Sequence, residues 1–323
     1  MGKLFAIGDI HGCNKELELL LTRLPFKDSD TILFLGDYID RGKDSKGVVN
    51  TILNLAKKYN VITLMGNHEQ MFLDFFYDKN TLEAGAFLFN GGTTTLSSYC
   101  SELGNFEFPK NHLDFFNNLK LFHETDDYFF VHAGLPELPL EEIKQRPLIF
   151  LEQFLWVRED FLKSNYQWNK TIIHGHTPIL DATLDNQKIN LDTGCVYDGK
   201  LSAIELPEKI LYSVPKINEE ATGPEIPGRR RSVRYSIVLP ITIDLGEGQA
   251  FFETINFSDH GMLIYTITSI ELAFTANQII RGIIGSTKSQ AYFTGRIKRV
   301  EKKATGSFLA IEFIQRPACI NPI

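Results

Sequence analysis

The sequence predicts an α/β fold with a buried parallel sheet, followed by a small all-β barrel. Three apolar runs near the start each end abruptly in glycine and a polar residue, at residues 4–7, 31–35 and 61–65. Segments with apolar residues at helical spacing separate these runs, at 15–24 and 43–59. This order is typical of a β-α-β-α-β unit, whose right-handed crossovers bring the strand ends to one edge of the sheet. We therefore expect one pocket at that edge.

Polar side chains that can bind metal follow each of the three runs directly. The runs lead into Gly8-Asp9-Ile10-His11-Gly12, Gly36-Asp37-Tyr38-Ile39-Asp40-Arg41-Gly42 and Gly66-Asn67-His68-Glu69. Asp, His and Asn without cysteine offer oxygen and nitrogen ligands together, which suit manganese, iron or similar ions better than a closed structural zinc site. The sequence thus predicts a metal centre at this edge.

Three later strand-like runs also end in polar groups. Residues 128–131 lead into His132, residues 171–173 into His174-Gly175-His176, and residues 189–191 into Asp192. These runs continue the pattern of buried strands that deliver polar side chains at their carboxyl ends. We expect them to contribute to the same site.

The chain resembles the phosphoprotein phosphatase family of calcineurin-like binuclear metallophosphoesterases over roughly its first two thirds. The motifs that carry this resemblance are the three segments above, His132-Ala133-Gly134-Leu135 and His174-Gly175-His176-Thr177-Pro178, in this order. The resemblance implies a sheet sandwich with flanking helices that holds two divalent ions. Manganese is the expected metal, with iron or zinc as alternatives.

The resemblance also assigns metal ligands to positions of this chain. Asp9, His11 and Asp37 are expected to hold one ion, and Asp37 is expected to bridge to the second. The other ligands of the second ion are expected to be Asn67, His132 and His176. His174 is expected to be a structural neighbour of the site.

Four further residues are expected to act in catalysis. Two metals about 3.5 to 4 Å apart can share a hydroxide that attacks phosphorus. His68 would supply the proton to the leaving oxygen, and Asp40 would orient His68 and favour its imidazolium form. Arg41 and Arg158, the latter within Trp156-Val157-Arg158-Glu159, would bind the phosphoryl group.

Composition fits a globular protein of two domains. The chain has 323 residues, of which 43% are apolar and 23% charged. No apolar run is long enough to cross a membrane, and the first strand begins too early for a signal peptide. The four cysteines show no paired or metal-type spacing. We expect a cytoplasmic protein with four unpaired thiols and no membrane partner.

A short polar linker is expected at residues 218–227, between a catalytic domain at 1–217 and a second domain at 228–323. The residues before Gly228 include 21 basic and 33 acidic side chains, and the remainder includes 12 basic and 7 acidic ones. The two parts therefore carry opposite net charge. A basic second domain favours an anionic ligand.

The second domain resembles PilZ domains, which are receptors for cyclic di-GMP. Short β-like runs predict a small barrel, at residues 237–245, 248–256, 262–268, 291–300 and 308–314. The PilZ signature has counterparts in Arg230-x-x-x-Arg234 and Asn256-x-Ser258-x-x-Gly261. The resemblance implies that Arg229, Arg230 and Arg234 bind the phosphates and stack on guanine. Asn256 and Ser258 would bind the base edge, and Gly261 would allow close backbone approach.

The leading hypothesis is therefore a bacterial serine/threonine or dual-specificity protein phosphatase, regulated by cyclic di-GMP, that acts on a phosphorylated protein. One alternative is a nucleotide hydrolase like the symmetrical diadenosine tetraphosphatases, which share the same motifs. Another is a non-catalytic cyclic di-GMP adaptor, which the complete ligand set disfavours. The arginine run also fits a nucleic-acid patch, but the barrel pattern favours the messenger, so no nucleic-acid partner is expected.

Overall fold

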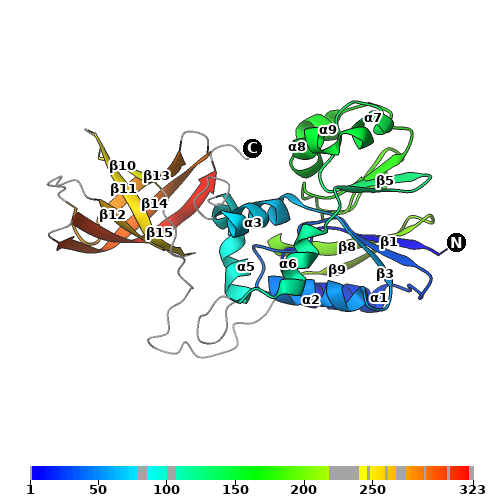
Figure 1. Cartoon of the computed structure of the whole chain (residues 1–323), viewed down its shortest axis with the longest axis horizontal. Coiled ribbons are helices and arrows are strands. Elements are labelled where there is room, and N and C mark those ends of the chain that lie inside the picture. Colours follow the sequence, from blue (N-terminus) through cyan, green and yellow to red (C-terminus); the bar gives the residue numbers. More distant parts are fainter. Residues whose placement is uncertain are drawn as a thin grey trace. The chain divides into compact units, whose positions relative to one another are not determined.

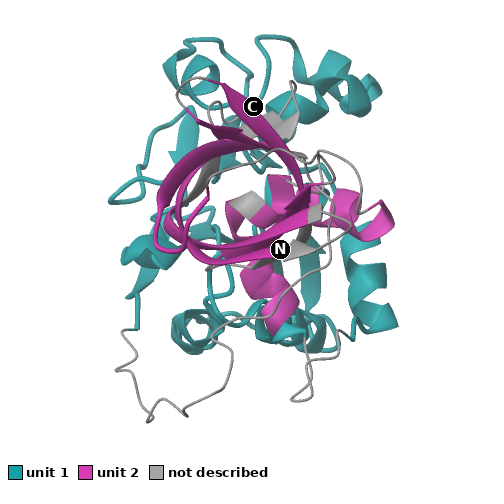
Figure 2. Ribbon diagram, turned by 90° about the vertical axis from the view of Figure 1, so that its left-hand side faces the viewer, with its two compact units in different colours: residues 1–70, 98–101, 105–222 teal, residues 71–97, 102–104, 223–323 magenta. Residues whose placement is uncertain are grey.

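The computed structural model confirms an α/β domain and a separate β-barrel (Figure 1). It describes residues 2–78, 86–99, 107–217, 240–245, 248–258, 261–266, 274–286, 289–303 and 306–319. The chain divides into two compact units, residues 1–70, 98–101 and 105–222, and residues 71–97, 102–104 and 223–323 (Figure 2). Each unit is described by itself below.

The first unit contains a five-stranded sheet. Its strands lie in the order β3 (Asn60–Thr63), β2 (Thr31–Phe34), β1 (Leu4–Ile7), β8 (Lys200–Leu206) and β9 (Ile210–Pro215). β1, β2 and β3 are parallel, and β8 pairs antiparallel with β1. The three parallel strands are the three predicted apolar runs, so the expected β-α-β-α-β unit is present.

A second sheet of four strands faces the first. It consists of β4 (Phe122–Glu124), β5 (Tyr128–Val131), β6 (Thr171–His174) and β7 (Lys188–Asn190), in that order. The core between the sheets combines Leu33 and Leu64 with Phe130, Ile173 and Ile189, all of which are buried. β5, β6 and β7 are parallel, so this sheet also directs its carboxyl ends to one edge.

Helices cover the outer faces of both sheets (Figure 1). The connections between the parallel strands of the first sheet are α1 (Asn14–Arg23) and α2 (Ser45–Leu55). The Asp44 carboxylate caps α2 by accepting a hydrogen bond of 2.8 Å from the Gly47 N–H. Beside the second sheet lie α7 (Leu140–Gln145), η2 (Pro147–Phe150), α8 (Leu151–Leu155) and α9 (Glu159–Lys163). The remaining helices of this unit are α6 (Lys110–Asn117) and the short η3 (Cys195–Tyr197).

Helix α3 (Asn67–Tyr77) starts in the first unit and continues in the second. It is followed by η1 (Leu88–Gly92) and α5 (Thr93–Ser98). Within the second unit, Phe72 of α3 packs edge-on against Phe87, with ring centroids 5.6 Å apart. No helix within the described ranges combines the length and the hydropathy that crossing a membrane requires.

A closed antiparallel barrel forms the C-terminal part of the second unit. Around the barrel the strands follow the order β10 (Pro240–Asp244), β11 (Gln249–Ser258), β12 (Gly261–Thr266), β15 (Gly306–Cys319), β14 (Ser289–Lys303) and β13 (Ile279–Ser286). Alternate residues face inward, as in β12, where Met262 and Ile264 are buried. This barrel confirms the predicted all-β domain.

Strand β13 has no counterpart among the five predicted runs. Gly282 and Gly285 interrupt its apolar pattern, and glycine weakens a strand signal in sequence. In the barrel, a Cβ atom at Gly282 would lie 2.6 Å from the Thr242 carbonyl oxygen and 2.7 Å from the Phe293 ring. Gly282 therefore weakens the strand signal in the sequence, but its lack of a side chain allows β13 to pack closely in the barrel.

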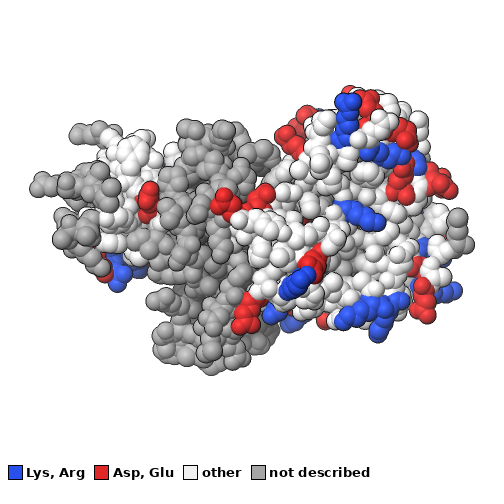
Figure 3. Space-filling view, viewed as in Figure 1, with Lys and Arg blue, Asp and Glu red and all other residues white. Residues whose placement is uncertain are grey.

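Charged side chains of both signs are mixed over the first unit. On the face drawn in Figure 3, lysine and arginine lie among aspartate and glutamate over α7 to α9. The exposed ion pair between Lys163 and Glu159 in α9 is one example. Such exposed pairs contribute little to stability.

Candidate metal centre

The loops after the parallel strands of both sheets meet at one edge. The His11 N–H donates to the Asp37 carbonyl oxygen at 2.8 Å, which joins the loops after β1 and β2. In the second sheet, the Gly175 N–H donates to the His132 carbonyl oxygen, also at 2.8 Å. The loops of both sheets then contribute side chains to one buried cluster. The structure therefore brings together the groups that the sequence places on separate strand ends.

Several residues of these loops have left-handed backbone conformations. The φ angles are +47° for His11, +53° for Asp37, +72° for Asp40, +67° for Arg41 and +66° for His176. Such conformations are uncommon for residues other than glycine and cost free energy, so they persist only where the surrounding structure imposes them. Their gathering in one set of loops marks this edge as a candidate functional site.

Glu69 holds two of the loops in place. Its carboxylate accepts hydrogen bonds from the backbone N–H groups of Asp37 at 2.8 Å, Tyr38 at 2.9 Å and Gly66 at 3.0 Å. Burial, followed by the charge of Asp37, raises the pKa of Glu69 to about 8. No role for Glu69 was expected from the sequence. Its position three residues after Gly66, at the start of α3, is the signal of a capping glutamate.

Asp37 lies between two groups of histidines. Its Oδ2 atom is 3.3 Å from His11 Nε2, and its Oδ1 atom is 3.4 Å from His132 Nε2. Burial raises the pKa of Asp37, whereas a proton on a neighbouring histidine, His132 above all, lowers that pKa below its usual range. One carboxylate oxygen faces each histidine group.

The histidine tautomers direct unprotonated nitrogens into the cluster. His11 Nδ1–H donates to the Ile39 carbonyl oxygen at 2.9 Å, and His132 Nδ1–H donates to the Leu35 carbonyl oxygen at 3.0 Å. Burial lowers the pKa of His11 to about 3 and also lowers the pKa of His132, so both rings are neutral. Their Nε2 atoms are then free to bind metal, an arrangement typical of metal-ligating histidines.

Asn67 Oδ1 faces two of these histidine rings. It lies 3.0 Å from His132 Nε2 and 3.1 Å from His176 Nδ1. An amide oxygen, a carboxylate oxygen and an unprotonated imidazole nitrogen are all hydrogen-bond acceptors. Acceptors that face one another at 3.0 and 3.1 Å fit a cation between them. The ligand atoms at this edge therefore suit a divalent metal ion.

At this edge, two groups of three residues have ligand atoms close enough to share one ion. They are His11, Asp37 and His68, and Asp37, His132 and His176, with the ligand atoms of each group within 4.8 Å of one another. Asp9 belongs to neither group in this geometry. Its carboxylate accepts hydrogen bonds of 3.0 and 3.3 Å from the His176 N–H. Asp9 nevertheless lies in the same site, because the charges of Asp192 and Asp37 act on it.

His68 and Asp40 form a fully buried pair. His68 Nδ1–H donates to Asp40 Oδ2 at 2.6 Å, and His68 Nε2 is a buried atom with no hydrogen-bond partner in the structure. The contact matches the expected orientation of His68 by Asp40. Burial lowers the pKa of His68 well below its usual value despite the opposing charge of Asp37. The ring is therefore neutral, which differs from the expected imidazolium form.

Both predicted phosphoryl-binding arginines reach the cluster. Arg41 Nη1 lies 2.7 Å from His11 Nε2, and its guanidinium carbon lies 5.4 Å from the centre of the Tyr197 ring. Arg158 Nε lies 3.1 Å from His176 Nε2, which also lies 3.1 Å from the Trp156 carbonyl oxygen. His174, the expected structural neighbour, donates from Nδ1 to the Gly175 carbonyl oxygen and packs edge-on against Phe161.

Asp192 is a further acidic group of the site, and it follows the run at residues 189–191 that was expected to contribute there. It is buried two residues after β7, and its Oδ1 atom accepts a hydrogen bond of 3.0 Å from the Gly194 N–H. Burial is the main cause that raises its pKa to about 6. The signal was its place directly after a buried strand, the pattern that identified the other site residues.

The predicted cyclic di-GMP residues fall partly outside the described ranges. Arg229, Arg230 and Arg234 lie outside them, while Asn256 and Ser258 belong to β11 and Gly261 opens β12. Ser258 pairs with Gly261 across the two strands. A Cβ atom at Gly261 would lie 2.0 Å from the Ile311 carbonyl oxygen. Glycine is therefore required at this position by the contact between β12 and β15.

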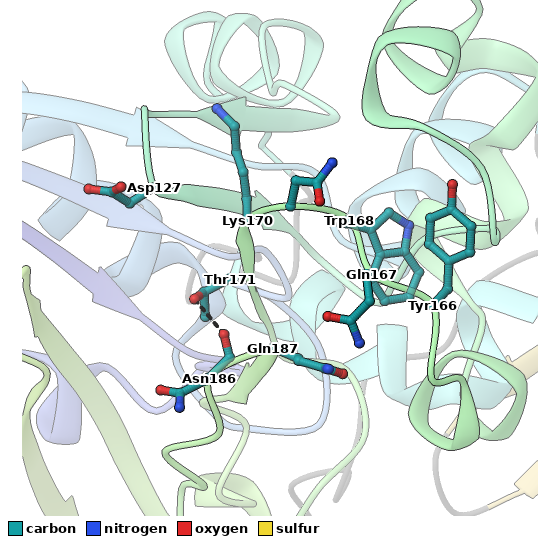
Figure 4. Close-up of a pocket in the computed structure, with 9 residues that line it drawn as sticks. Asp127, Tyr166, Gln167, Trp168, Lys170, Thr171, Asn186 and Gln187 are labelled. Atoms are coloured by element: carbon teal, nitrogen blue, oxygen red, sulfur yellow. Dashed lines mark hydrogen bonds between the residues drawn. The ribbon is translucent and has the colours of Figure 1, made fainter.

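A separate cavity lies at the opposite end of β6. It has a volume of about 280 Å³, and its lining includes Tyr166, Trp168, Lys170 and Thr171 (Figure 4). Thr171 is the first residue of β6, whereas His174, beside the metal centre, is the last. The Lys170 ammonium is paired with the Glu124 carboxylate. None of the predicted site residues lines this cavity.

The chain matches two family descriptions. Residues 2–207 match the calcineurin-like phosphoesterases, and residues 228–318 match the PilZ domain. The first range contains every candidate metal ligand described above. The second contains the arginines and the strand residues of the predicted messenger site.

Among curated proteins, the chain is similar to enzymes named asymmetrical bis(5'-nucleosyl)-tetraphosphatase PrpE. The protein of Oceanobacillus iheyensis is 32% identical over 235 residues, which cover 66% of this chain and 92% of that protein. The protein of Anoxybacillus flavithermus is 28% identical over 232 residues, covering 65% and 92%. A crystal structure provisionally described as a diadenosine tetraphosphatase has a TM-score of 0.51 at 24% identity and covers 68% of this chain and 95% of its own. That likeness shows the fold.

Proposed function

Since the chain belongs to the calcineurin-like phosphoesterases and carries a C-terminal PilZ domain, we propose that it is a metal-dependent phosphohydrolase of dinucleoside polyphosphates. The observation that carries the hydrolase assignment is the Asp37 carboxylate, which turns one oxygen toward each of two histidine groups. The names of the relatives favour a dinucleoside tetraphosphate as substrate, cut asymmetrically. This replaces the protein phosphatase as first candidate.

Asp37 would bridge two metal ions held by the surrounding side chains. Asp9 and His11 would complete the first ligand set, and Asn67, His132 and His176 the second. Two divalent ions in such a site supply a nucleophilic hydroxide near neutral pH and stabilise charge on the phosphoryl oxygens. Glu69, through its bonds to the Asp37 and Gly66 backbones, keeps the loops that present these ligands in position.

Arg41 and Arg158 would bind the phosphoryl oxygens from two sides. Each guanidinium presents paired N–H donors that match phosphate geometry. In the free protein they contact His11 and His176, which are ligands on opposite sides of Asp37. Arrival of the substrate would replace these contacts with charge-assisted hydrogen bonds.

His68 would hold the proton that the leaving oxygen requires. Its Nε2 atom has no partner, and Asp40 fixes the ring through Nδ1. Burial keeps the free ring neutral with its proton on Nδ1, so Nε2 would have to take up a proton from water when an anionic substrate binds. The proton would then pass from Nε2 to the leaving phosphate.

Tyr197 supports a nucleotide substrate. Its side chain is 58% exposed, although its ring lies against the Arg41 guanidinium. An exposed aromatic ring beside a phosphate-binding arginine can stack on a nucleobase while the arginine binds the phosphate chain.

Product analysis tests the proposed substrate. Purified protein with manganese is incubated with diadenosine tetraphosphate, and the products are separated by ion exchange. Asymmetrical cleavage gives ATP and AMP, whereas symmetrical cleavage gives two ADP molecules. A turnover that is no faster than that of phosphoserine, phosphothreonine and phosphotyrosine peptides would contradict the nucleotide proposal.

A protein phosphatase of serine/threonine or dual specificity is the second candidate. It is favoured by the Gly-Asp-x-x-Asp-Arg-Gly and Gly-Asn-His-Glu motifs, which resemble those of phosphoprotein phosphatases. Both reactions place a phosphoryl group between the same two arginines. Faster turnover of phosphopeptides than of the dinucleotide in the experiment above would establish this candidate.

We also propose that cyclic di-GMP binds the PilZ domain and changes turnover. The proposed boundaries are a catalytic domain at residues 1–217, a linker at 218–227 and the PilZ domain at 228–323. The match to the PilZ family and the closed barrel support this. Calorimetric titration of the protein with cyclic di-GMP tests binding, with the variant Arg230→Ala/Arg234→Ala as control. Binding without any change in turnover would leave the domain a role in location or partner recognition. A chain that also takes up no metal would be an adaptor.

A further inference from the structure

Two cysteines outside the metal-ligand set lie together beneath the site. Cys13 precedes α1 and Cys195 opens η3, and both are buried and free. Their sulfur atoms and a Glu16 carboxylate oxygen all lie within 4.8 Å of one another. Sequence spacing gave no sign of this pair, because the fold brings η3 against the start of α1.

Lys216 closes this cluster toward solvent. Its ammonium lies 3.2 Å from Cys13 Sγ and 2.9 Å from Glu16 Oε1, and a quarter of its side chain is exposed. The Ile217 N–H adds a hydrogen bond of 2.9 Å to the same Glu16 oxygen. Two cysteines and a glutamate could also hold a metal ion. The ammonium already supplies the positive charge, so thiol chemistry fits this cluster better than metal binding.

We propose that Cys13 and Cys195 are an oxidation site that closes to a disulfide when the protein meets a peroxide. A disulfide bond is about 2.05 Å long, so the two sulfur atoms need to approach by no more than about 3 Å. Each lies next to a loop of the metal centre and not within a strand. A disulfide bond between Cys13 and Cys195 could therefore form while the two sheets stay packed together.

The chemistry needs one molecule of peroxide. The Cys13 sulfur takes one peroxide oxygen to become a sulfenic acid, as the O–O bond breaks and the first water leaves. The Cys195 sulfur then attacks the Cys13 sulfur, the S–S bond forms, and the second water leaves. The two thiol protons end in these waters, and two electrons pass from sulfur to the peroxide.

The disulfide would tie together two loops that carry site residues. Cys13 Sγ donates to the His11 carbonyl oxygen at 3.5 Å, a contact that a disulfide cannot make. On the other side, Cys195 follows Gly194, whose N–H binds Asp192. Oxidation is therefore expected to slow hydrolysis, and this consequence rests on the proposed function.

Peptide mapping of the full chain tests the site independently of any substrate. A Cys100→Ser/Cys319→Ser variant leaves Cys13 and Cys195 as the only thiols. After hydrogen peroxide, we expect a mass lower by two hydrogen atoms, a linked peptide that contains both residues, and full reversal by dithiothreitol. The chain with all four cysteines is mapped in parallel, so the result does not depend on the folding of the variant.

Single substitutions supply the matched controls. In the same background, Cys195→Ser should leave Cys13 to gain oxygen atoms instead of losing hydrogen, and Cys13→Ser should prevent the linked peptide. Intact thiols, or oxygen addition without a linked peptide in the unsubstituted pair, would overturn the oxidation site. Turnover of p-nitrophenyl phosphate is measured on the same samples, and equal turnover of cross-linked and reduced protein would overturn the effect on hydrolysis.

Discussion

At the scale of single residues, the site depends on which hydrogen-bonding groups remain free. His11 and His132 each give their Nδ1 proton to a backbone carbonyl, which leaves Nε2 for a metal. Asp37 then faces both rings, with one carboxylate oxygen toward each. His68 has the opposite arrangement, because its Nδ1 proton binds Asp40 and its Nε2 has no partner. Three predictions follow from these assignments.

The first concerns the bridging carboxylate. Asp37→Asn removes the charge that both histidine groups face, so metal content and turnover should both fall, turnover by more than about 100-fold, the upper range for outer-shell partners. Metal content by mass spectrometry and turnover with manganese check this. The exposed Asp28→Asn variant is the matched control. Full metal content in Asp37→Asn would contradict the bridging role.

The second concerns His68. His68→Gln should slow hydrolysis of phenyl phosphate, whose phenoxide is a poor leaving group, by about 100-fold, because that oxygen needs a proton. With p-nitrophenyl phosphate, whose leaving group needs none, the loss should be much smaller. The comparison of kcat for the two substrates checks this. Equal losses for both would assign His68 a structural or metal-binding role instead.

The third concerns pH and His174. Burial lowers the pKa of His174 to about 4, whereas its ordinary value is 6.5. Between these values the unfolded chain binds a proton that the folded chain does not, so stability falls as the pH drops from 6.5 toward 4. His174→Asn should reduce this slope by up to about 1.4 kcal/mol per pH unit. Urea unfolding in EDTA at pH 6.5, 5.5 and 4.5 checks this. If stability depends on pH equally in His174→Asn and the unchanged protein, the pKa of His174 is not lowered.

At the scale of elements, strand pairing decides which small residues are required. The barrel brings β12 so close to β15 that a side chain at Gly261 would meet the Ile311 carbonyl oxygen, 2.0 Å from the Cβ position. The expected role of this glycine was close approach to the messenger. Contact between strands already explains it. Gly248, by contrast, has nothing within 4 Å of its Cβ position.

These two glycines form a matched pair of substitutions. Gly261→Ala should destabilise the barrel by about 1 to 3 kcal/mol, the usual cost of forcing extra atoms into a packed structure. Gly248→Ala should change stability by less than about 0.5 kcal/mol. Thermal unfolding followed by circular dichroism checks both. Equal stability of the two variants would show that β12 can shift away from β15.

At the scale of the whole molecule, every candidate metal ligand and both site arginines come before residue 218. Lys216 and Ile217, the last described residues before the linker range, are tied to Glu16 of α1 by an ion pair and a hydrogen bond. The catalytic domain is therefore closed at its C-terminal end by contacts of its own. The messenger signature lies wholly beyond it.

A shortened chain tests this separation. A chain that ends at Ile217 should keep metal binding and hydrolysis, because it retains all six ligands. It should lose any response to cyclic di-GMP. Metal content and turnover with and without the messenger check this, beside the full chain. Loss of metal from the shortened chain would mean that the centre depends on the second domain.

Local sequence by itself determined the fold class and most of the site. An apolar run that ends in a short polar motif places its side chains at a strand tip, and parallel strands bring their tips to one edge. The positions of Asp9, His11, Asp37, Asn67 and His132 could therefore be predicted. The substrate could not, because the same motifs serve phosphoric esters and anhydrides alike.

Only the tertiary structure decided the contacts between distant segments. Glu69 binds the loop after β2, and Cys195 meets Cys13; no local pattern specifies either contact. The tertiary structure also decided that His68 is neutral when free, because burial outweighs the charge of Asp37. The pattern of apolar residues determines which face of a helix or strand will be buried. The contacts between distant elements, and their effect on pKa values, exist only after folding.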